Sequence, residues 1–429
     1  MADHPIRIIV KDDLERSRLT VFFRLLLAIP HLIALFLWSI GALVAGIVNW
    51  FATLIKGRSP KGLHDFLASY VRYATHVYAY VLLAASPFPG FGGERGYPIE
   101  VEIDPPELQS RWKTAFRILL GLPALVLATV LVGSWGGGGA RMSEEDGQFA
   151  ADLFSSVGVA WTIAFLAWFA CLARGRMPRG FRDLLAYVLR YGAQAYGYLF
   201  LLTDRYPNSD PHDPPSREPV PEHPIRLRVE DDLRRSRLTV FFRLLLTFPH
   251  FLWLILWSLL SLVVAILNWV ATLLTGRPPR VFHRFLSAFV RYEVHVLAYL
   301  LLVANPFPGF VGKSGSYPVD PELPPPEPQS RWRTAFRVLL AIPAFIVTSA
   351  IGTAAFVAAF LAWFAALATG RMPEGLRNVG AYYLRYTAQE QGYGVYLLTD
   401  RYPYSGPAEY EEPEEMEEPG EAPPLAARA

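Results

Sequence analysis

Apolar positions in this chain are gathered into four long stretches, each of which begins at an arginine. The two longest run from Arg24 to Arg58 and from Arg243 to Arg277, and shorter relatives begin at Arg117 and Arg337. The run over residues 30–55 holds no Asp, Glu, Lys or Arg, and it is longer than the roughly 20 residues that cross a bilayer. A surface helix of a water-soluble protein has one polar face that meets water. The pattern therefore predicts helices inserted into a membrane.

The four stretches belong to a larger internal repeat. Residues 4–27 return with few changes as residues 223–246, and residues 108–120 return as residues 328–340. The chain is therefore predicted to consist of two tandem halves, each with two related units. The expected divisions are a first membrane half (1–210) with a Gly-rich insertion (134–156), a Pro/Asp-rich linker (211–222), a second membrane half (223–404) and an acidic, disordered tail (405–429).

Each unit has the same internal order of segments. A short extended lead is followed by an apolar run, and in the unit starts at 5–10, 98–103 and 224–229 polar and apolar residues alternate. This period predicts strands, and we expect them to pair with one another outside the membrane. The predicted fold class is an all-α integral membrane protein of four related helical units in two tandem halves, with short extended strands outside the membrane.

The number of membrane crossings stays open at this point. A second, more polar helix follows each apolar run after a Gly-Arg-x-Pro turn. If these second helices cross the bilayer, the chain has about eight spans, and if they lie on its surface, it has about four. Basic residues flank both ends of the apolar runs, so their distribution does not decide the orientation.

A polar stripe follows one side of each predicted second helix, at about 100° per residue. Every stripe has an arginine near mid-helix and a His or Gln four residues later. These candidates for contact with a ligand or a lipid headgroup are Arg72 and His76, Arg190 and Gln194, Arg291 and His295, and Arg385 and Gln389. An arginine at the bilayer centre costs at least about 2.5–3.5 kcal/mol. The stripe must therefore face lipid headgroups, a network of backbone carbonyls and carboxylates such as Asp65 and Asp183, or a wet cavity for an anionic ligand.

Isolated polar residues inside the longest runs have a simpler interpretation. His31, Asn49, His250 and Asn268 occupy matching positions in the two halves and are predicted to pack helices through hydrogen bonds. A metal site built from histidines alone has no supporting motif, so no metal and no cofactor is expected. Phosphate-binding, zinc-protease and nucleophile-elbow motifs are absent, and no pair of carboxylates lies within an apolar segment. We therefore expect no enzyme.

Composition agrees with the hydropathy pattern. Hydrophobic residues make up 52% of the 429 residues and charged residues 18%, whereas soluble proteins carry about 25% charged residues. The formal net charge is +2, and the arginines flank apolar segments rather than forming tracts, so no nucleic-acid partner is expected. The single cysteine, Cys171, excludes an intrachain disulfide.

Several short motifs together resemble a known family. They are Arg-Trp-Lys/Arg at helix starts (111–113, 331–333), Ile-Pro-His (29–31), a Gly-Arg-x-Pro turn (175–178) and Leu-Leu-Thr-Asp-Arg-Tyr-Pro exits (201–207, 397–403). The combination resembles the prokaryotic membrane proteins known as domain of unknown function 4389, present in two tandem copies. The resemblance implies a multi-pass protein of the prokaryotic plasma membrane and assigns no activity. The helix starts at 16–18 and 235–237 depart from the pattern because they lack its Trp.

Two functions remain as expectations. The first is a non-catalytic membrane scaffold or accessory subunit that contacts membrane lipids or a protein partner. The alternative is a transporter or channel for an anionic solute or lipid, because duplicated membrane repeats often place a substrate site at their interface. In that case Arg72, His76, Arg291 and His295 are the expected ring around the site.

Overall fold

The computed structural model of this protein describes residues 4–133, 158–211 and 219–408. The predicted insertion and most of the predicted tail lie outside these residues. The first half contains β1 (Ile6–Val10), α1 (Arg18–Phe22), α2 (Arg24–Lys56), α3 (Lys61–Val81), β2 (Ile99–Ile103), α4 (Arg111–Ala115), α5 (Arg117–Val132), α7 (Val159–Arg174) and α8 (Arg179–Leu199). The second half contains β3 (Arg226–Val229), α9 (Arg237–Phe241), α10 (Arg243–Thr275), α11 (Arg280–Leu300), β4 (Val319–Glu322), α12 (Arg331–Ala335), α13 (Arg337–Thr369) and α14 (Glu374–Gly394).

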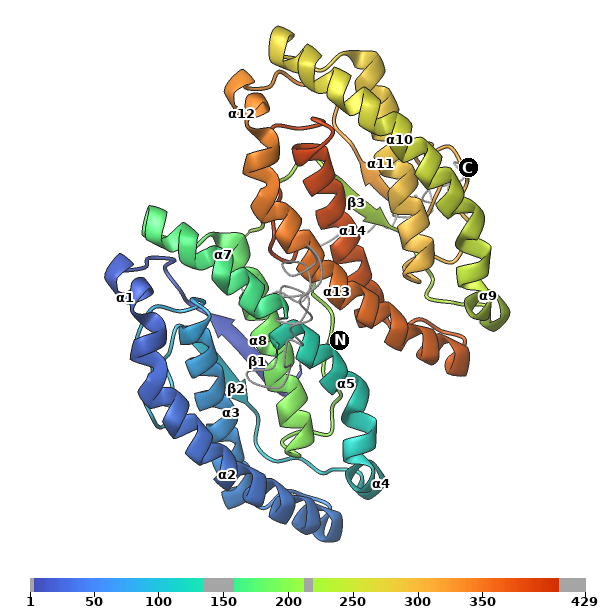
Figure 1. The fold of residues 1–429 in the computed structure, drawn as a ribbon. Coiled ribbons are helices and arrows are strands. Elements are labelled where there is room, and N and C mark those ends of the chain that lie inside the picture. The colour runs from blue at the N-terminus through green and yellow to red at the C-terminus, as the bar shows by residue number, and fades with distance from the viewer. Residues whose placement is uncertain (1–3, 134–157, 212–218, 409–429) are drawn as a thin grey trace, which may run out of the picture.

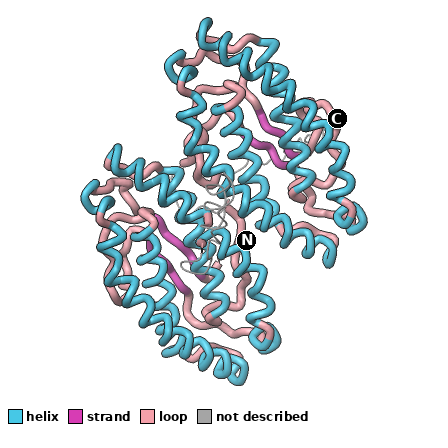
Figure 2. Tube along the Cα trace, in the orientation of Figure 1, coloured by secondary structure: helices cyan, strands magenta, loops and turns pink. Residues whose placement is uncertain are grey.

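The described strands form one two-stranded antiparallel ribbon in each half. β1 pairs with β2, with Ile8 opposite Val101, and β3 pairs with β4, with Leu227 opposite Pro321. The predicted pairing of the extended leads is therefore confirmed, and it joins the two units of one half (Figure 2).

In each half the long helices pack against the second helices, and the second helices pack against the ribbon. α2 packs against α3, α5 and α7 pack against α8, and α3 and α8 pack against each other. The main packing partners of the ribbon are the second helices, with β2 on α3 and β1 on α8. Figure 1 shows α2 along one edge of the first half and α5 with α7 along the other, with the ribbon between them. The long helices of the half meet at both ends, where α1 packs on α7 and α4 packs on α2.

The helix pair α5 and α7 corresponds to the single helix α13 of the second half. Gly133 and Gly158, which end α5 and precede α7, both have positive φ, at 81° and 80°. A Cβ atom on Gly158 would lie 2.6 Å from the Cα of Gly133, so only glycine allows this approach. The chain therefore leaves α5 at Gly133 and begins α7 after Gly158, directly beside it. Together α5 and α7 keep the place that α13 has in the second half.

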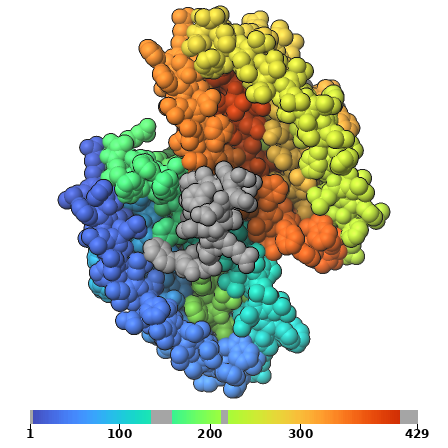
Figure 3. Space-filling model, viewed as in Figure 1, coloured from blue at the N-terminus to red at the C-terminus, as the bar shows by residue number. Residues whose placement is uncertain are grey.

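The two halves meet through their even-numbered units. α13 packs against both α5 and α7, and apolar side chains of α13 and α14 extend the core of the first half. The exit of the second half also reaches across the junction, where the Tyr404 hydroxyl donates to Asp183 Oδ2 at 2.6 Å. The two halves thus form one continuous body, with α2 and α10 on its outer sides (Figure 3).

The long helices α2 and α10 are apolar on their exposed side, and many of their buried residues are polar. Among the described helices, α2, α10 and α13 are long and apolar enough to cross a membrane. Only 17% of the most apolar window of α2 and of α10 is buried, and Leu37 and Leu43 of α2 are each 62% exposed. The buried positions of α2 include Arg24, His31 and Asn49. This is the reverse of a water-soluble helix, whose exposed side is polar.

Candidate functional site

The stripe residues of the even-numbered units fasten the second helices to backbone. Gln194 Nε2 donates to the carbonyl of Ile6 at 3.0 Å, and its Oε1 accepts from the amide of Asn208 at 2.9 Å. Arg190 donates to the carbonyl of Asp210. Gln194 therefore ties α8 to the start of β1 and to the exit segment of its own half.

The fourth unit repeats this arrangement. Gln389 Nε2 donates to the carbonyl of Ile225 at 3.0 Å, its Oε1 accepts from the amide of Tyr404 at 3.1 Å, and Arg385 Nη2 donates to the carbonyl of Gly406 at 2.6 Å. Both even-numbered stripes thus face protein backbone. Of the three environments considered for the stripe, this geometry favours the structural network.

The stripe residues of the odd-numbered units meet carboxylates of the ribbon. Arg72 Nε donates to the carbonyl of Val101 at 3.1 Å and lies 3.5 Å from Glu100 Oε1. In the third unit, one carboxylate serves both stripe residues: Asp320 Oδ1 lies 3.3 Å from Arg291 Nε and 2.8 Å from His295 Nε2.

His76 has no such carboxylate. Its ring stacks on Tyr97 with centroids 4.6 Å apart, and among the described residues its Nε2 has no hydrogen-bond partner. Burial, with a smaller effect of Arg72, lowers the pKa of His76 to about 4, so the ring is neutral at pH 7. His76 therefore adds no positive charge to the ring of Arg72, His76, Arg291 and His295 that the transporter alternative expects.

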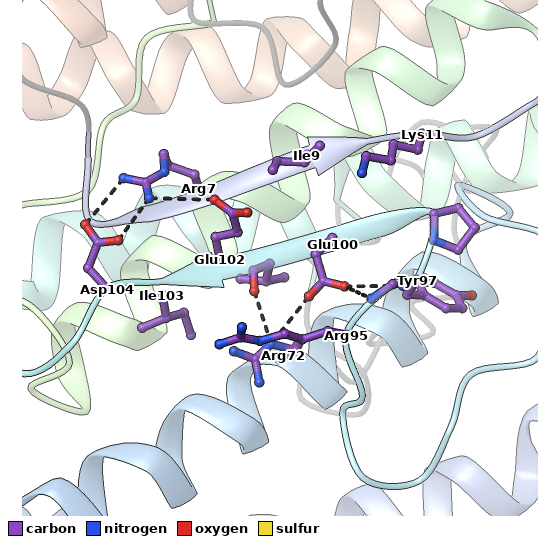
Figure 4. Close-up of a pocket in the computed structure, with 13 residues that line it drawn as sticks. Arg7, Ile9, Lys11, Arg72, Arg95, Tyr97, Glu100, Glu102, Ile103 and Asp104 are labelled. Atoms are coloured by element: carbon purple, nitrogen blue, oxygen red, sulfur yellow. Dashed lines mark hydrogen bonds and ion pairs between the residues drawn. The ribbon is translucent and has the colours of Figure 1, made fainter.

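A cavity of about 440 Å³ lies beside the first ribbon (Figure 4). Its charged lining consists of Arg7, Lys11, Arg72, Arg95, Glu100, Glu102 and Asp104. Arg7 Nη2 lies 2.9 Å from Asp104 Oδ1 and 3.6 Å from Glu102 Oε2, so acidic groups compensate much of the positive charge. In the described residues Arg7 thus pairs with Glu102 and Asp104 of the neighbouring segment, and Arg72 of α3 lies beside Glu100 of β2.

The four residues predicted to pack the long helices do contact the second helices or their ends. His31 Nδ1 lies 2.8 Å from the Tyr73 hydroxyl, and His250 Nδ1 lies 2.7 Å from the Tyr292 hydroxyl. Asn49 Nδ2 donates to the carbonyl of Phe200 at 2.9 Å. In the same way, Asn268 Nδ2 donates to the carbonyl of Tyr396 at 3.0 Å.

Replacing Asn49 by leucine is expected to destabilise the protein more than replacing Asn268. Asn49 Oδ1 also accepts from Ser59 at 2.7 Å, whereas Asn268 Oδ1 has no partner within the described residues. Interhelical hydrogen bonds in membrane proteins contribute about 0.6 kcal/mol on average and about 1.7 kcal/mol at most. Thermal unfolding in detergent micelles checks this, and an equal loss in the two variants would contradict a role for Ser59.

Four buried arginines at the starts of the long helices form a pattern that hydropathy did not assign. Each guanidinium lies over a tyrosine of the second helix, with its Cζ 4.1–4.3 Å from the ring centroid. The pairs are Arg24 with Tyr80, Arg117 with Tyr198, Arg243 with Tyr299, and Arg337 with Tyr393. The repeat contained a signal for these pairs, because in every unit the polar stripe ends in a tyrosine eight residues after the mid-helix arginine of that stripe. Cation–π contact of this kind locks the two helices of a unit together.

A buried glutamate in the second half, with a second, half-buried glutamate near it, was also missed. Glu390 of α14 is 4% exposed, its Oε2 accepts from the Thr348 hydroxyl at 3.5 Å, and Glu293 of α11 accepts from Gln391 at 2.9 Å. Burial, together with the nearby Glu293, raises the pKa of Glu390 to about 8. The first half has Ala74 and Ala195 at the matching positions, so comparison of the repeats could have identified the pair.

In the part of the chain that the structure describes, no group of three or more His, Cys, Asp or Glu side chains could hold a metal ion.

Comparison with known proteins agrees with the internal repeat. No match was found among curated proteins or among solved structures. A family model matches the chain four times, at residues 18–91, 153–209, 237–311 and 331–405, so that each match covers one unit where the resemblance predicted one for each half. The chain therefore belongs to the family described as domain of unknown function (DUF4389).

Proposed function

We propose that this protein is a non-catalytic membrane scaffold or accessory subunit of the prokaryotic plasma membrane. Its long helices contact lipid, and its ribbons and loops are available to a protein partner. The observation that carries the proposal is the reversed burial of α2 and α10, whose exposed sides are apolar while their polar residues are buried. Contact with lipid is the simplest environment for such a surface, because water would leave it uncompensated.

The arrangement of polar side chains supports a scaffold more than an enzyme. Arg72 and Arg291 pair with ribbon carboxylates, and Arg190 and Arg385 bind backbone carbonyls. Groups already engaged in this way stabilise the fold and are not poised for proton transfer or nucleophilic attack. Among the described residues that line the cavity beside the first ribbon there is no Ser, Thr, Cys or His.

The transporter alternative has a direct test. We expect vesicles that contain the protein to take up chloride, phosphate and a fluorescent anionic phospholipid no faster than protein-free vesicles. The variants Arg72→Ala and Arg291→Ala should give the same rates, because these side chains hold a ribbon and line no pathway. Uptake that the wild type supports and the two variants lose would replace the scaffold proposal by a transporter.

The scaffold role needs evidence of its own. Cross-linking in the native membrane should convert the 48.1-kDa chain into one discrete larger species. If the chain is recovered only as a solitary monomer with a transport activity, the scaffold proposal is wrong.

A further inference from the structure

We infer that the long helices lie flat within one leaflet of the membrane, with both ribbons on its water side. The inference rests on the proposed membrane function and specifies how the protein meets lipid. It replaces both crossing schemes, with about four or about eight spans, by an embedding parallel to the membrane surface. The occupant of the exposed apolar side is thus a single leaflet of lipid.

The first argument is the level of the ribbon along the long helix. α2 and α3 form an antiparallel hairpin, in which Tyr80 lies over Arg24, Tyr73 meets His31, and Phe66 approaches Gly41. The middle of α3, at Arg72, is therefore level with the part of α2 between His31 and Gly41. Arg72 is in turn bound to the middle of β2. The ribbon thus lies beside the apolar run of α2 and not beyond its end.

The ribbon is charged and exposed at this level. Arg7, Glu102 and Asp104 have exposed side-chain fractions of 37%, 49% and 44%. If α2 crossed the bilayer, these three side chains would lie at the depth of the hydrocarbon, where one charged residue costs at least about 2.5–3.5 kcal/mol. If α2 lies flat, the second helices separate the ribbon from the lipid and the same charges meet water.

The second argument is the length of the apolar side. On α2 exposed large apolar residues extend from Leu25 to Ile55 without an exposed charge between them. At 1.5 Å per residue this side is about 45 Å long, whereas the hydrocarbon core of a bilayer is about 30 Å thick. A flat helix has no such limit, because its whole length lies at one depth.

The third argument is the position of the exposed cations. Many of them lie at the two ends of the long helices, as Arg18 and Arg176 do at one end of the first half and Lys56, Arg58, Arg111 and Lys113 do at the other. Crossing helices would divide these cations between the two sides of the membrane, against the usual excess on one side. Flat helices place all of them at the headgroup level of one leaflet, where they complement anionic lipids. Trp112 and Trp332, which are 71% and 79% exposed, lie among them as interfacial anchors.

Cysteine accessibility distinguishes the two orientations. With Cys171 replaced by alanine, single cysteines are introduced as Ser17→Cys, Lys56→Cys and Glu102→Cys, all at exposed positions. Each is labelled with a membrane-impermeant maleimide in intact spheroplasts and in inverted membrane vesicles. A flat helix predicts that all three react from the same side. Labelling of Ser17→Cys and Lys56→Cys from opposite sides would overturn the inference.

A depth measurement provides an independent readout along the helix. Nitroxide labels at Leu25, Phe36 and Leu43 share the exposed side of α2. In vesicles of phosphatidylcholine and phosphatidylglycerol, the flat orientation predicts similar oxygen accessibility at all three labels. A steady increase from Leu25 to Leu43 would mean that α2 crosses the bilayer. Failure of the proposed function looks different, because the cross-linking experiment then recovers only a solitary monomer whatever the depth of α2.

Discussion

Replacing Asp320 by alanine is expected to lower the free energy of unfolding by about 3–5 kcal/mol, the usual loss when one partner of a buried ion pair is removed. Asp320 is buried in β4 and its Oδ1 lies 3.3 Å from Arg291 and 2.8 Å from His295, while its Oδ2 accepts from the amide of Gly315 at 2.7 Å. Alanine leaves the nearly buried Arg291 charge without a partner. Denaturant unfolding in detergent micelles measures the loss.

The same strand supplies the matched control. Glu322 lies two residues after Asp320 and is exposed, so Glu322→Ala is expected to change stability by no more than about 0.5 kcal/mol. Asp320→Asn should fall between the two, because an amide retains the shape and one acceptor but not the charge. If Asp320→Ala and Glu322→Ala behave alike, the ribbon of the second half is not held by this carboxylate.

The helical periodicity of the sequence predicted which face of a second helix carries these polar residues, but not which residues that face contacts. The spacing of Arg72, His76 and Tyr80 places them on one side of a helix, and the structure has them there. Their partners are distant in sequence. Arg72 lies beside Glu100 of β2, and the ring of Tyr80 packs against Arg24 at the start of α2. Pairing across such separations depends on how the hairpin and the ribbon pack, which a pattern along one helix does not contain.

The repeat itself predicted more of the fold than hydropathy did. The extended leads pair as expected, and α5 with α7 occupies the place of α13 because Gly133 and Gly158 allow the chain to leave and rejoin the helix. Differences between repeats carried the remaining information. Odd-numbered units bind the ribbon through carboxylates, while Gln194 and Gln389 of the even-numbered units bind its backbone. Glu293 and Glu390 were missed because they lie on different helices, α11 and α14, far apart in the sequence.

Between pH 6.5 and pH 8 the variant Glu390→Gln is expected to gain about 2 kcal/mol of stability relative to the wild type. The folded protein keeps a proton on Glu390 up to a pKa of about 8, whereas the unfolded chain releases it near the ordinary value of 4.5. This group therefore releases a proton on unfolding in this range, and its contribution to the free energy of unfolding decreases by about 1.4 kcal/mol per pH unit, or about 2 kcal/mol in all. Above pH 8 the effect no longer grows.

Histidines act in the opposite direction. Burial lowers the pKa of His4, His76 and His223 from 6.5 to about 4, so unfolding takes up protons between these values and stability rises with pH there. Unfolded histidines are still half protonated at pH 6.5, so this effect continues above pH 6.5. It is the same in the wild type and in Glu390→Gln, and it cancels in the difference between them. Glu293 acts with the same sign as Glu390, since burial also raises its pKa.

Unfolding in detergent micelles at pH 6.5, 7.25 and 8 measures the effect, with Glu322→Gln as the exposed control. The stability of Glu390→Gln relative to the wild type should rise by about 2 kcal/mol from pH 6.5 to pH 8, while that of Glu322→Gln relative to the wild type stays constant. A neutral amide gains there because it keeps the hydrogen bond from Thr348 without a charge buried beside Glu293. If the difference between Glu390→Gln and the wild type is constant over this range, Glu390 does not change its protonation state there.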